Sequence, residues 1–411
     1  MYVRLVTKKD TSHLCVGRLC SLRFQVVTTL TSPHFFVNFH DRQNQMSIFV
    51  RNRQKCFFAS SSCRFPIDNW ISVIIMNLIY EHEKRTRKDE TPMKIVLLER
   101  LRLGADISYE CLKDFGEVIA YDQTNTPEEA RARIKDADVV IVDQFPLNEE
   151  TLKDAEHLKF ITMTSTGTDF VDFSYTNTHG ITVANIRGYS TDSVAQHTIT
   201  MLLYLYEQLS FFNSYVKEGS YIDDTQNRSF SVPFHDLSGK TWGIVGLGQI
   251  GKKVAAIAAA LGCEIIYYSP SGRSYDCAYR QVDFETLLSE SDVISLHSPL
   301  SGYTAGLFGY DEFCRMKRSA FFINSARGGL VQEDGLARAI KENLIQGAGL
   351  DVLTHEPMSP DCPLLPVLDS PKLLITPHMA WASVESRSRA MHEMYLNIQA
   401  WLNNTSRNIC R

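Results

Sequence analysis

From Met93 onward, short runs of apolar residues alternate with longer segments of helical periodicity. Apolar runs bounded by turn residues are typical of strands buried in a parallel sheet, and the segments between them are typical of connecting helices. A first group of predicted strands has the ranges 94–98, 137–143, 158–169 and 180–185. A second group, which begins at TWGIVG, has the ranges 241–246, 264–268, 292–296, 320–324, 347–351 and 373–376. The pattern predicts an α/β protein with two doubly wound parallel sheets.

Two predicted helices connect the two groups of strands. The segment 190–218 contains neither proline nor glycine and is predicted to form one long helix between them. The segment 383–402 is predicted to be a helix that returns to pack on the first group. We therefore predict a first domain made of residues 93–190 and 379–411, with a second domain, residues 191–378, inserted between its two parts.

The first 92 residues do not follow this pattern, because they lack sustained helical or alternating periodicity. From Thr11 to His40 there is no acidic residue, which weakly resembles an organelle transit peptide. The apolar run 70–80 has 11 residues, fewer than the ~20 needed to span a bilayer. We predict an extension outside the core that is disordered or not made at all, with translation starting at Met93. Import into an organelle is the alternative.

Composition narrows the class of protein. A chain of 411 residues, 44% hydrophobic and 22% charged, is typical of a globular protein with two or more domains. The net charge is −5, with +7 in residues 1–92 and −12 in residues 93–411, so we expect no nucleic-acid partner. The ten cysteines include no CxxC pair and no grouping with histidine. We read them as reduced thiols of a cytoplasmic protein, and we predict neither a metal site nor a membrane partner.

The motif GLGQIG (246–251) directly follows a predicted strand and opens a predicted helix. The first glycine permits a tight turn, the second lets the backbone approach a pyrophosphate, and the third lets helix and strand pack closely. The helix N-terminus adds unpaired N–H groups and the positive end of the helix dipole. This context predicts a dinucleotide site, although a glycine turn that serves packing alone is the alternative. The predicted cofactor-binding residues of the motif are Gly246, Gly248, Gln249, Ile250 and Gly251.

The next strand ends in Ser269, where an acidic residue usually binds the adenosine ribose. Serine removes a charge that would repel a 2′-phosphate, and the nearby Arg273 is able to pair with one. The sequence therefore allows both NAD(H) and NADP(H) and does not decide between them.

Three further strand ends carry an arginine, carboxylates and an imidazole. Arg327 follows the strand 320–324, Asp351 and Glu356 follow the strand that ends at 351, and His378 follows the strand 373–376. The carboxyl ends of parallel strands meet at one edge of a sheet, where α/β proteins bind their ligands. An arginine fork binds a carboxylate, a histidine transfers a proton, and a carboxylate orients the imidazole. This set suits the reduction of a 2-oxo acid, although Glu356 as a loop charge and His378 as a structural residue are the alternatives.

With these motifs, residues 93–411 resemble the D-isomer-specific 2-hydroxyacid dehydrogenases, and among them the members similar to glycerate dehydrogenase and hydroxypyruvate reductase. The segments that carry the resemblance are TGTD (166–169), GYSTDSVAQHT (188–198), GLGQIG (246–251), HSPL (297–300), NSARGG (324–329), LDVLTHEP (350–357) and TPHMAWAS (376–383).

The resemblance implies a Rossmann-type NAD(P)-binding domain inserted into a flavodoxin-like substrate domain. It also implies that Arg327, Glu356 and His378 form the catalytic set, and that the cofactor's nicotinamide half lies against Ser298, Ser325 and Asp351. The loop Thr166, Gly167, Thr168 would offer N–H groups to the substrate carboxylate, which Arg327 also binds. The expected substrate is a 2-oxo or D-2-hydroxy acid such as hydroxypyruvate, glyoxylate or D-glycerate, and the expected assembly is a homodimer.

Three observations leave alternatives open. Ser269 leaves the cofactor undecided, the proline-rich segment 358–373 is able to reshape the substrate entrance, and Arg187 either attracts an anionic group or faces solvent. A dinucleotide-sensing scaffold, similar to corepressors of the same fold, is the second hypothesis for function. A formate dehydrogenase is the third, and the carboxylate of Glu356 argues against it because an amide is typical there.

Overall fold

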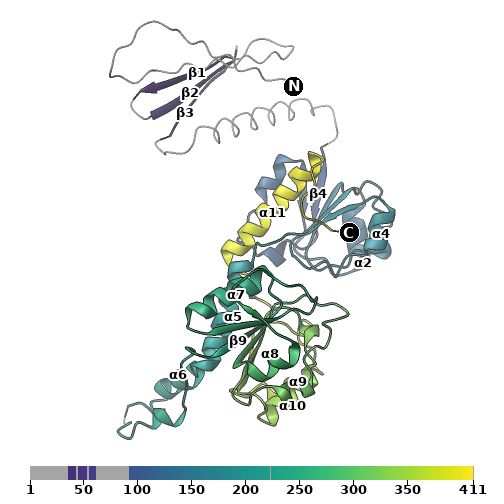
Figure 1. Cartoon of the computed structure of the whole chain (residues 1–411). Helices are drawn as coiled ribbons and strands as arrows, with labels where there is room; N and C mark the ends of the chain where they lie inside the picture. Colours follow the sequence, from purple (N-terminus) through teal and green to yellow (C-terminus); the bar gives the residue numbers. More distant parts are fainter. Residues whose placement is uncertain (1–35, 43–44, 53–54, 62–91, 223, 411) are drawn as a thin grey trace. The chain divides into compact units, whose positions relative to one another are not determined.

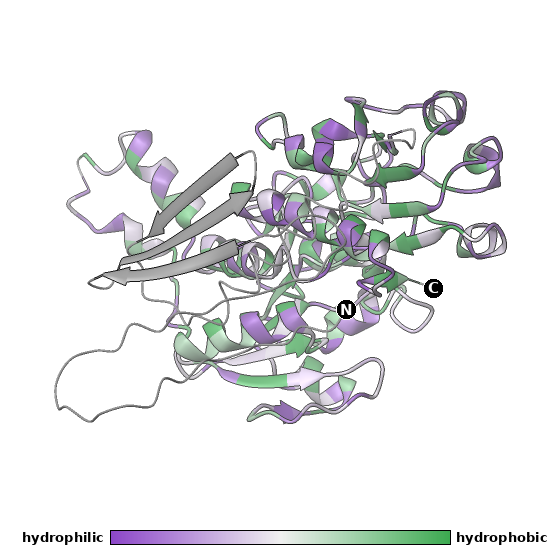
Figure 2. Ribbon diagram, turned by 90° about the horizontal axis from the view of Figure 1, so that it is seen from above, coloured by the Kyte–Doolittle hydropathy of each residue, from purple (hydrophilic) through white to green (hydrophobic). Residues whose placement is uncertain are grey.

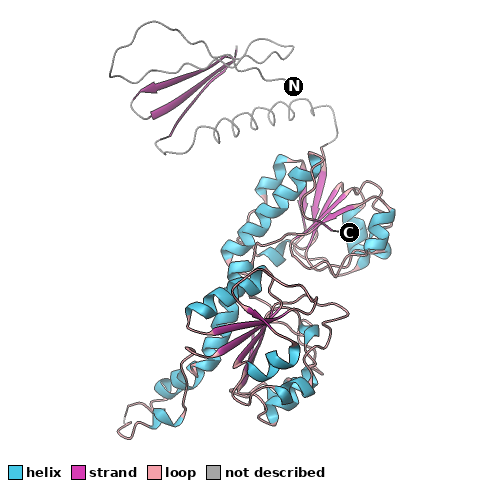
Figure 3. Cartoon of the chain, viewed as in Figure 1, coloured by secondary structure: helices cyan, strands magenta, loops and turns pink. Residues whose placement is uncertain are grey.

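The computed structural model describes residues 36–42, 45–52, 55–61, 92–222 and 224–410 (Figure 1). They belong to two units, Met1–Thr91 and Pro92–Arg411. The second unit consists of strands with helices around them (Figure 3). In the segments that the structure describes, every helix is too short or too polar to cross a membrane.

The first unit contains a three-stranded antiparallel sheet in the order β1-β2-β3. Its strands are β1 (Phe36–Arg42), β2 (Gln45–Asn52) and β3 (Lys55–Ser61). The sequence analysis found no regular element here, which is wrong for these three strands. Strands that pair with their neighbours in the chain need only short segments, so no long periodic pattern marks them. The apolar run 70–80 lies outside the described residues, and the role of residues 1–92 stays a prediction.

The first sheet of the second unit has six strands in the order β16-β8-β7-β6-β4-β5. The strands are β4 (Lys94–Leu97), β5 (Glu117–Ala120), β6 (Val139–Val142), β7 (Phe160–Met163), β8 (Thr182–Ala184) and β16 (Ile409–Cys410). Only β16 is antiparallel. The first five strands have the flavodoxin-like order 2-1-3-4-5. The sequence analysis missed β5 and β16, which lie at the sheet edges and lack a fully buried apolar run.

Helices cover both faces of this sheet. They are α2 (Pro127–Ile134), α3 (Glu149–Leu152), α4 (Phe173–Thr178) and α11 (Val384–Leu402), with 3-10 turns η2 (Arg100–Leu103) and η3 (Glu110–Asp114). Ile134 and Leu152 belong to the core on one face, and Met394 and Ile398 to the core on the other. The Trp401 ring stacks on Phe160, with centroids 5.0 Å apart. The predicted return of the C-terminal helix to this sheet is confirmed.

The second sheet has seven parallel strands in the order β11-β10-β9-β12-β13-β14-β15. The strands are β9 (Thr241–Val245), β10 (Glu264–Tyr268), β11 (Arg280–Gln281), β12 (Val293–Leu296), β13 (Phe321–Asn324), β14 (Gly347–Leu350) and β15 (Leu373–Ile375). This is the Rossmann order 3-2-1-4-5-6 with one further strand. The predicted fold class is confirmed, and the short exposed β11 is the strand that the sequence did not predict.

Two layers of helices enclose the second sheet. They are α5 (Thr191–Tyr206), α7 (Gln249–Ala260), α8 (Phe284–Glu290), α9 (Tyr310–Arg315) and α10 (Glu333–Lys341), with α6 (Leu209–Lys217) and the turns η4 (Arg228–Ser231), η5 (Gly328–Leu330) and η6 (Leu365–Val367). Leu202 and Val254 belong to the core on the face of α5 and α7. Leu287, Phe313 and Leu336 belong to the core on the other face. Figure 2 shows green, hydrophobic stretches in strands of the second unit.

The predicted long helix 190–218 is two helices, which corrects the sequence analysis. Gln208, between α5 and α6, has a positive φ of 53°, and its side-chain amide donates to the carbonyl of Leu205 over 2.9 Å. A left-handed residue ends an α-helix, and no proline or glycine in the sequence marks this break. The helix α5 packs on β13 and β14, whereas α6 has no buried residue.

Candidate functional site

Three neighbouring strands of the second sheet end at the same edge. Arg327 follows β13, Asp351 follows β14, and His378 follows β15. These strands are adjacent and parallel, with Asn324 level with Leu350 and Leu350 level with Ile375. Arg327, Asp351 and His378, which the sequence predicted as site residues, therefore lie at one edge of a sheet with the Rossmann strand order.

Glu356 and His378 form a close pair. Glu356 Oε2 lies 2.6 Å from His378 Nδ1, and Glu356 Oε1 accepts a hydrogen bond of 2.8 Å from the N–H of Leu353. Their side chains are 30% and 27% exposed, so both can be reached from solvent. Burial raises the pKa of Glu356, but the hydrogen bonds from His378 and from the Leu353 N–H outweigh it, so the pKa is lowered. The ionised carboxylate orients the ring through Nδ1 and leaves Nε2 for a reacting atom.

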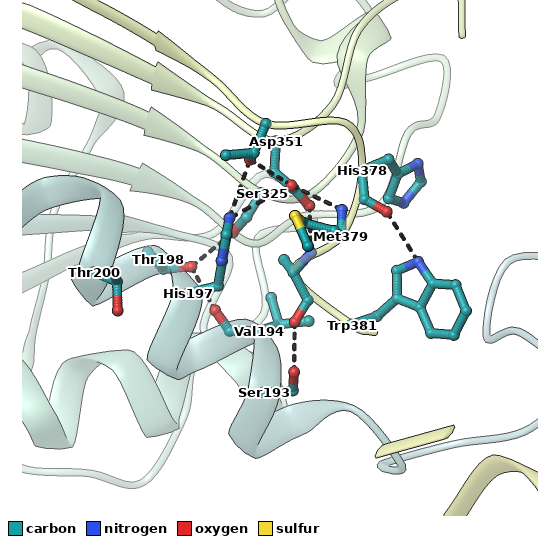
Figure 4. Close-up of polar contacts among 12 residues, drawn as sticks. Ser193, Val194, His197, Thr198, Thr200, Ser325, Asp351, His378, Met379 and Trp381 are labelled. Atoms are coloured by element: carbon teal, nitrogen blue, oxygen red, sulfur yellow. Dashed lines mark hydrogen bonds and ion pairs between the residues drawn. The ribbon is translucent and has the colours of Figure 1, made fainter. Parts of the chain in front are cut away.

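Asp351 determines the position of His378 through the backbone (Figure 4). Its carboxylate is 1% exposed and accepts hydrogen bonds from Thr376 Oγ1 (2.6 Å), Met379 N (2.9 Å) and Ala380 N (2.8 Å). Its carbonyl oxygen accepts from the N–H of His378 over 2.7 Å. These bonds stabilise the turn in which His378 has a positive φ of 52°. In this structure the Asp351 carboxylate bonds to the turn. Its contact with a nicotinamide stays a prediction.

Two residues without a role in the sequence analysis complete this turn. His197 on α5 lies with Nε2 3.0 Å from Thr376 Oγ1 and 3.5 Å from Asp351 Oδ1. Trp381 donates from Nε1 to the carbonyl oxygen of His378 over 3.1 Å (Figure 4). His197 is part of a segment that carried the family resemblance, but no local pattern shows that it reaches a turn 179 residues further along the chain.

Arg327 approaches the loop after β7. Its side chain is 38% exposed, and Nε lies 3.8 Å from Asp169 Oδ2. A Cβ at Gly167 would lie 2.4 Å from Arg327 Nη2, so the guanidinium lies directly against this glycine and would have to move if a side chain were added there. Within the described residues, the N–H groups of Thr166, Gly167 and Thr168 donate no hydrogen bond. The structure thus brings together a guanidinium and three free N–H groups, which suits a carboxylate ligand.

The turn between β9 and α7 depends on its glycines. Gly246 has a φ of +90°, and a Cβ there would lie 2.4 Å from Ser298 Oγ. A Cβ at Gly251 would lie 2.3 Å from the carbonyl oxygen of Gly246. A Cβ at Gly248, which caps α7, would have nothing within 4 Å. Gly246 and Gly251 therefore serve the turn and its packing, and the open space at Gly248 fits a phosphate group at the helix N-terminus.

The remaining predicted cofactor residues follow strands β10, β12 and β13 of the same sheet. Ser298 is 4% exposed and donates to the carbonyl oxygen of Val245 over 3.2 Å. Ser325 Oγ lies 2.7 Å from Thr198 Oγ1. Ser269 is buried at the end of β10, and Arg273 is exposed with its guanidinium 5.2 Å from the ring centroid of Tyr275. Gln249 and Ile250 open α7 as predicted. Among the described residues no cluster of three metal-ligating side chains occurs.

A Rossmann sheet with a glycine turn that fits a phosphate, and with an arginine and a Glu–His pair at its carboxyl edge, defines a nucleotide-dependent oxidoreductase. The chain belongs to the family of D-isomer specific 2-hydroxyacid dehydrogenases. Residues 199–380 match the NAD binding domain of that family. The family resemblance found in the sequence is thus confirmed.

Among its relatives, a glycerate dehydrogenase of Methylorubrum extorquens is 36% identical over 319 residues, which cover 77% of this chain and 98% of that protein. A hydroxypyruvate reductase of Blautia hydrogenotrophica is 35% identical over 324 residues, covering 77% and 99%. The structure of a D-lactate dehydrogenase from Aquifex aeolicus with NAD and lactic acid is similar with a TM-score of 0.65 and 28% identity, covering 76% of this chain and 96% of that one.

Proposed function

We propose that this protein transfers a hydride between NAD(P)H and a small 2-oxo acid of the hydroxypyruvate or glyoxylate type, or in reverse from D-glycerate. The observation that carries the proposal is the Glu356–His378 pair, 2.6 Å apart, at the sheet edge that also bears Arg327. The names of the relatives, glycerate dehydrogenase and hydroxypyruvate reductase, support this class of substrate.

The residues have separate tasks in this reaction. The bound nicotinamide cofactor supplies or takes the hydride. Arg327 and the N–H groups of residues 166–168 hold the substrate carboxylate, and the guanidinium polarises the keto oxygen. His378 Nε2 gives a proton to that oxygen during reduction and removes it during oxidation. The Glu356 carboxylate orients the imidazole and balances the charge of its protonated form.

A panel of 2-oxo acids assayed with NADH and with NADPH tests the proposal directly. Reduction of hydroxypyruvate or glyoxylate with either cofactor is expected. Absence of turnover with every acid would contradict it and would favour the dinucleotide-sensing scaffold, which the enzyme names of the relatives do not favour.

Glu356→Gln is expected to retain part of the reduction rate and to remove the acidic limb of its pH profile. The pKa of Glu356 is lowered in the folded protein, so the carboxylate stays ionised until the pH falls below the usual range of glutamate. Below that pH it takes up a proton, and the His378 imidazolium loses its counter-charge. Glutamine cannot titrate, so the variant shows no such limb. Measurement of kcat against pH for both proteins checks this, and identical profiles would remove Glu356 from the mechanism.

We propose NADPH as the preferred cofactor. Ser269 at the end of β10 carries no charge, and its Oγ lies 3.4 Å from Ser271 Oγ. Two cations lie near the Tyr275 ring: Lys252 Nζ at 4.9 Å from its centroid and the Arg273 guanidinium at 5.2 Å. Two hydroxyls and two cations suit a 2′-phosphate, whereas a ribose diol without phosphate is usually held by an acid.

Ser269→Asp is expected to weaken NADPH use more than NADH use, because the new carboxylate repels the 2′-phosphate and accepts the ribose hydroxyls. Arg273→Ala should raise the KM for NADPH about ten- to a hundredfold and barely change that for NADH. The affinity for 2′,5′-ADP, measured by calorimetry, should fall in parallel. Arg280→Ala, which removes an exposed arginine paired with Glu290, is the control. A wild type that prefers NADH, with a ratio unaltered by these substitutions, would contradict the cofactor proposal.

We also propose a homodimer and a cytoplasmic location. Large apolar side chains on and after α6 are exposed, among them Val216 (56%), Ile222 (81%) and Phe230 (81%). A second copy that covers them would remove an unusual amount of apolar surface from water. Sedimentation analysis of the full chain distinguishes a dimer from a monomer. The location is supported by the cysteines, because the six from Cys111 to Cys410 are free thiols.

A further inference from the structure

Asp143 is a buried carboxyl group in the substrate-binding half of the site that the mechanism above does not use. It directly follows β6 and is 5% exposed. The neighbouring strand β7 runs parallel, with Val142 level with Met163, so Asp143 lies beside Thr164 at the carboxyl edge. Thr164 leads into the loop 166–168 that approaches Arg327. Asp143 therefore lies at the base of the loop that is proposed to hold the substrate carboxylate.

Hydrogen bonds hold both the side chain and the backbone of Asp143. Thr164 Oγ1 donates to Asp143 Oδ1. The N–H groups of Asp143, Gln144 and Phe145 all donate to Glu99 Oε2, each over 3.0 Å, which holds the backbone of the segment. A side chain held in this way presents its second oxygen in one direction.

That second oxygen, Oδ2, is available to a ligand. It accepts no hydrogen bond from the residues that the structure describes. Among the described residues, three buried side-chain polar atoms have neither solvent contact nor a hydrogen-bond partner, and Asp143 Oδ2 is not one of them. Asp143 Oδ2 is thus an unpaired oxygen with access to the outside, on a residue that is almost completely buried.

The charge of Asp143 interacts with that of His378, one of the proposed reacting groups. Burial raises the pKa of Asp143, while the Thr164 hydrogen bond and the charges of Arg102 and His378 act in the opposite direction. Burial raises the pKa of Tyr189 to about 12, and the charge of Asp143 contributes, whereas Arg327 lowers it. Asp143 is therefore within electrostatic reach of His378, and Tyr189 is within reach of both Asp143 and Arg327.

We propose that Asp143 Oδ2 binds the hydroxyl group on carbon 3 of the substrate and thereby selects 3-hydroxylated 2-oxo acids over those with a plain methyl group. This inference rests on the proposed function. A hydroxyl group both donates and accepts, so it pairs with Asp143 in the ionised and in the protonated form. A methyl group in the same place leaves a buried carboxyl oxygen without a partner, and sites built around a hydrogen bond reject such substrates strongly.

A purely structural Asp143 would give a different result. Its bond to Thr164 joins the ends of β6 and β7, so a structural role predicts a lower melting temperature on substitution and an equal loss of activity with every substrate. Binding of the substrate hydroxyl predicts a loss confined to hydroxylated substrates. The ratio of kcat/KM values for hydroxypyruvate and pyruvate separates the two roles.

The experiment uses the full chain with saturating NADPH, or NADH if that is preferred. The wild type should favour hydroxypyruvate over pyruvate by roughly ten- to a hundredfold. Asp143→Val should reduce this preference to within about threefold, because valine is of similar size but cannot bond the hydroxyl. Asp138→Asn changes a carboxylate at the other end of β6, which accepts from the N–H of Lys94 over 2.9 Å, and should leave the preference unaltered.

A second variant keeps the test valid if Asp143→Val folds poorly. Asp143→Val with Thr164→Val replaces both bonding partners by apolar groups of similar shape, which is often tolerated. It should show the same loss of preference. A preference retained in either folded variant, or a wild type that does not discriminate, would overturn the inference. Absence of turnover with both acids in the wild type would instead overturn the proposed function.

Discussion

His378→Ala is expected to lower kcat/KM for hydroxypyruvate by about 10²–10⁴-fold, the usual cost of removing a positioned acid or base. The side chain is 27% exposed, and its ring is bonded to Glu356, so the fold depends little on it. The turn itself is held through the backbone N–H of His378 and the Asp351 carboxylate, which alanine leaves in place. The loss should therefore appear in kcat, with a melting temperature close to that of the wild type.

The control for this prediction is His392→Ala, which removes an exposed imidazole from α11, where it stacks with Tyr395. Its kinetics should equal those of the wild type. Added imidazole should restore part of the rate of His378→Ala, because imidazolium is small enough to enter the space that the ring vacates and can donate the proton. Near-normal kcat/KM in folded His378→Ala would show that another group transfers the proton.

Arg327→Lys is expected to lower kcat/KM by about a hundredfold or more, with a higher KM and a lower kcat. Lysine keeps the charge but lacks the planar fork that binds a carboxylate with two hydrogen bonds. Each charge-assisted bond contributes about 1.5–3 kcal/mol, and the same guanidinium is proposed to polarise the keto oxygen. Both kinetic constants should change, because substrate binding and charge stabilisation in the transition state are lost together.

Arg315→Lys on α9 is the matched control, since Arg315 pairs with Glu285 and Glu312 away from the sheet edge. Steady-state kinetics with hydroxypyruvate at saturating cofactor measure both variants. If Arg327→Lys changed only the melting temperature, the guanidinium would be a structural group and the proposed binding of the substrate carboxylate would be wrong.

The sequence determined the elements whose signals are local. Strand β9, the glycine turn and the start of α7 were predictable because a buried apolar run followed by GLGQIG permits few backbone conformations. Arg327, Asp351 and His378 were predictable as one set because each follows such a run, and parallel strands bring their carboxyl ends to one edge. Elements with weak local signals were not predicted. The strands β5 and β16 lie at sheet edges and lack a buried apolar run, and Gln208 ends a helix where the sequence has no glycine or proline.

Only the tertiary structure decided which residues support this set. The bond between His197 and Thr376 joins positions 179 residues apart, and Asn397 reaches Asn185 across 212 residues. Thr164 and Asp143 are close only because β6 and β7 pair in one register. No local pattern encodes such contacts, since they depend on how sheets and helices pack after they form. Local periodicity determined the strands and the residues proposed to react, whereas long-range packing decided which side chains hold the His378 turn and which carboxyl oxygen remains unpaired beside the loop 166–168.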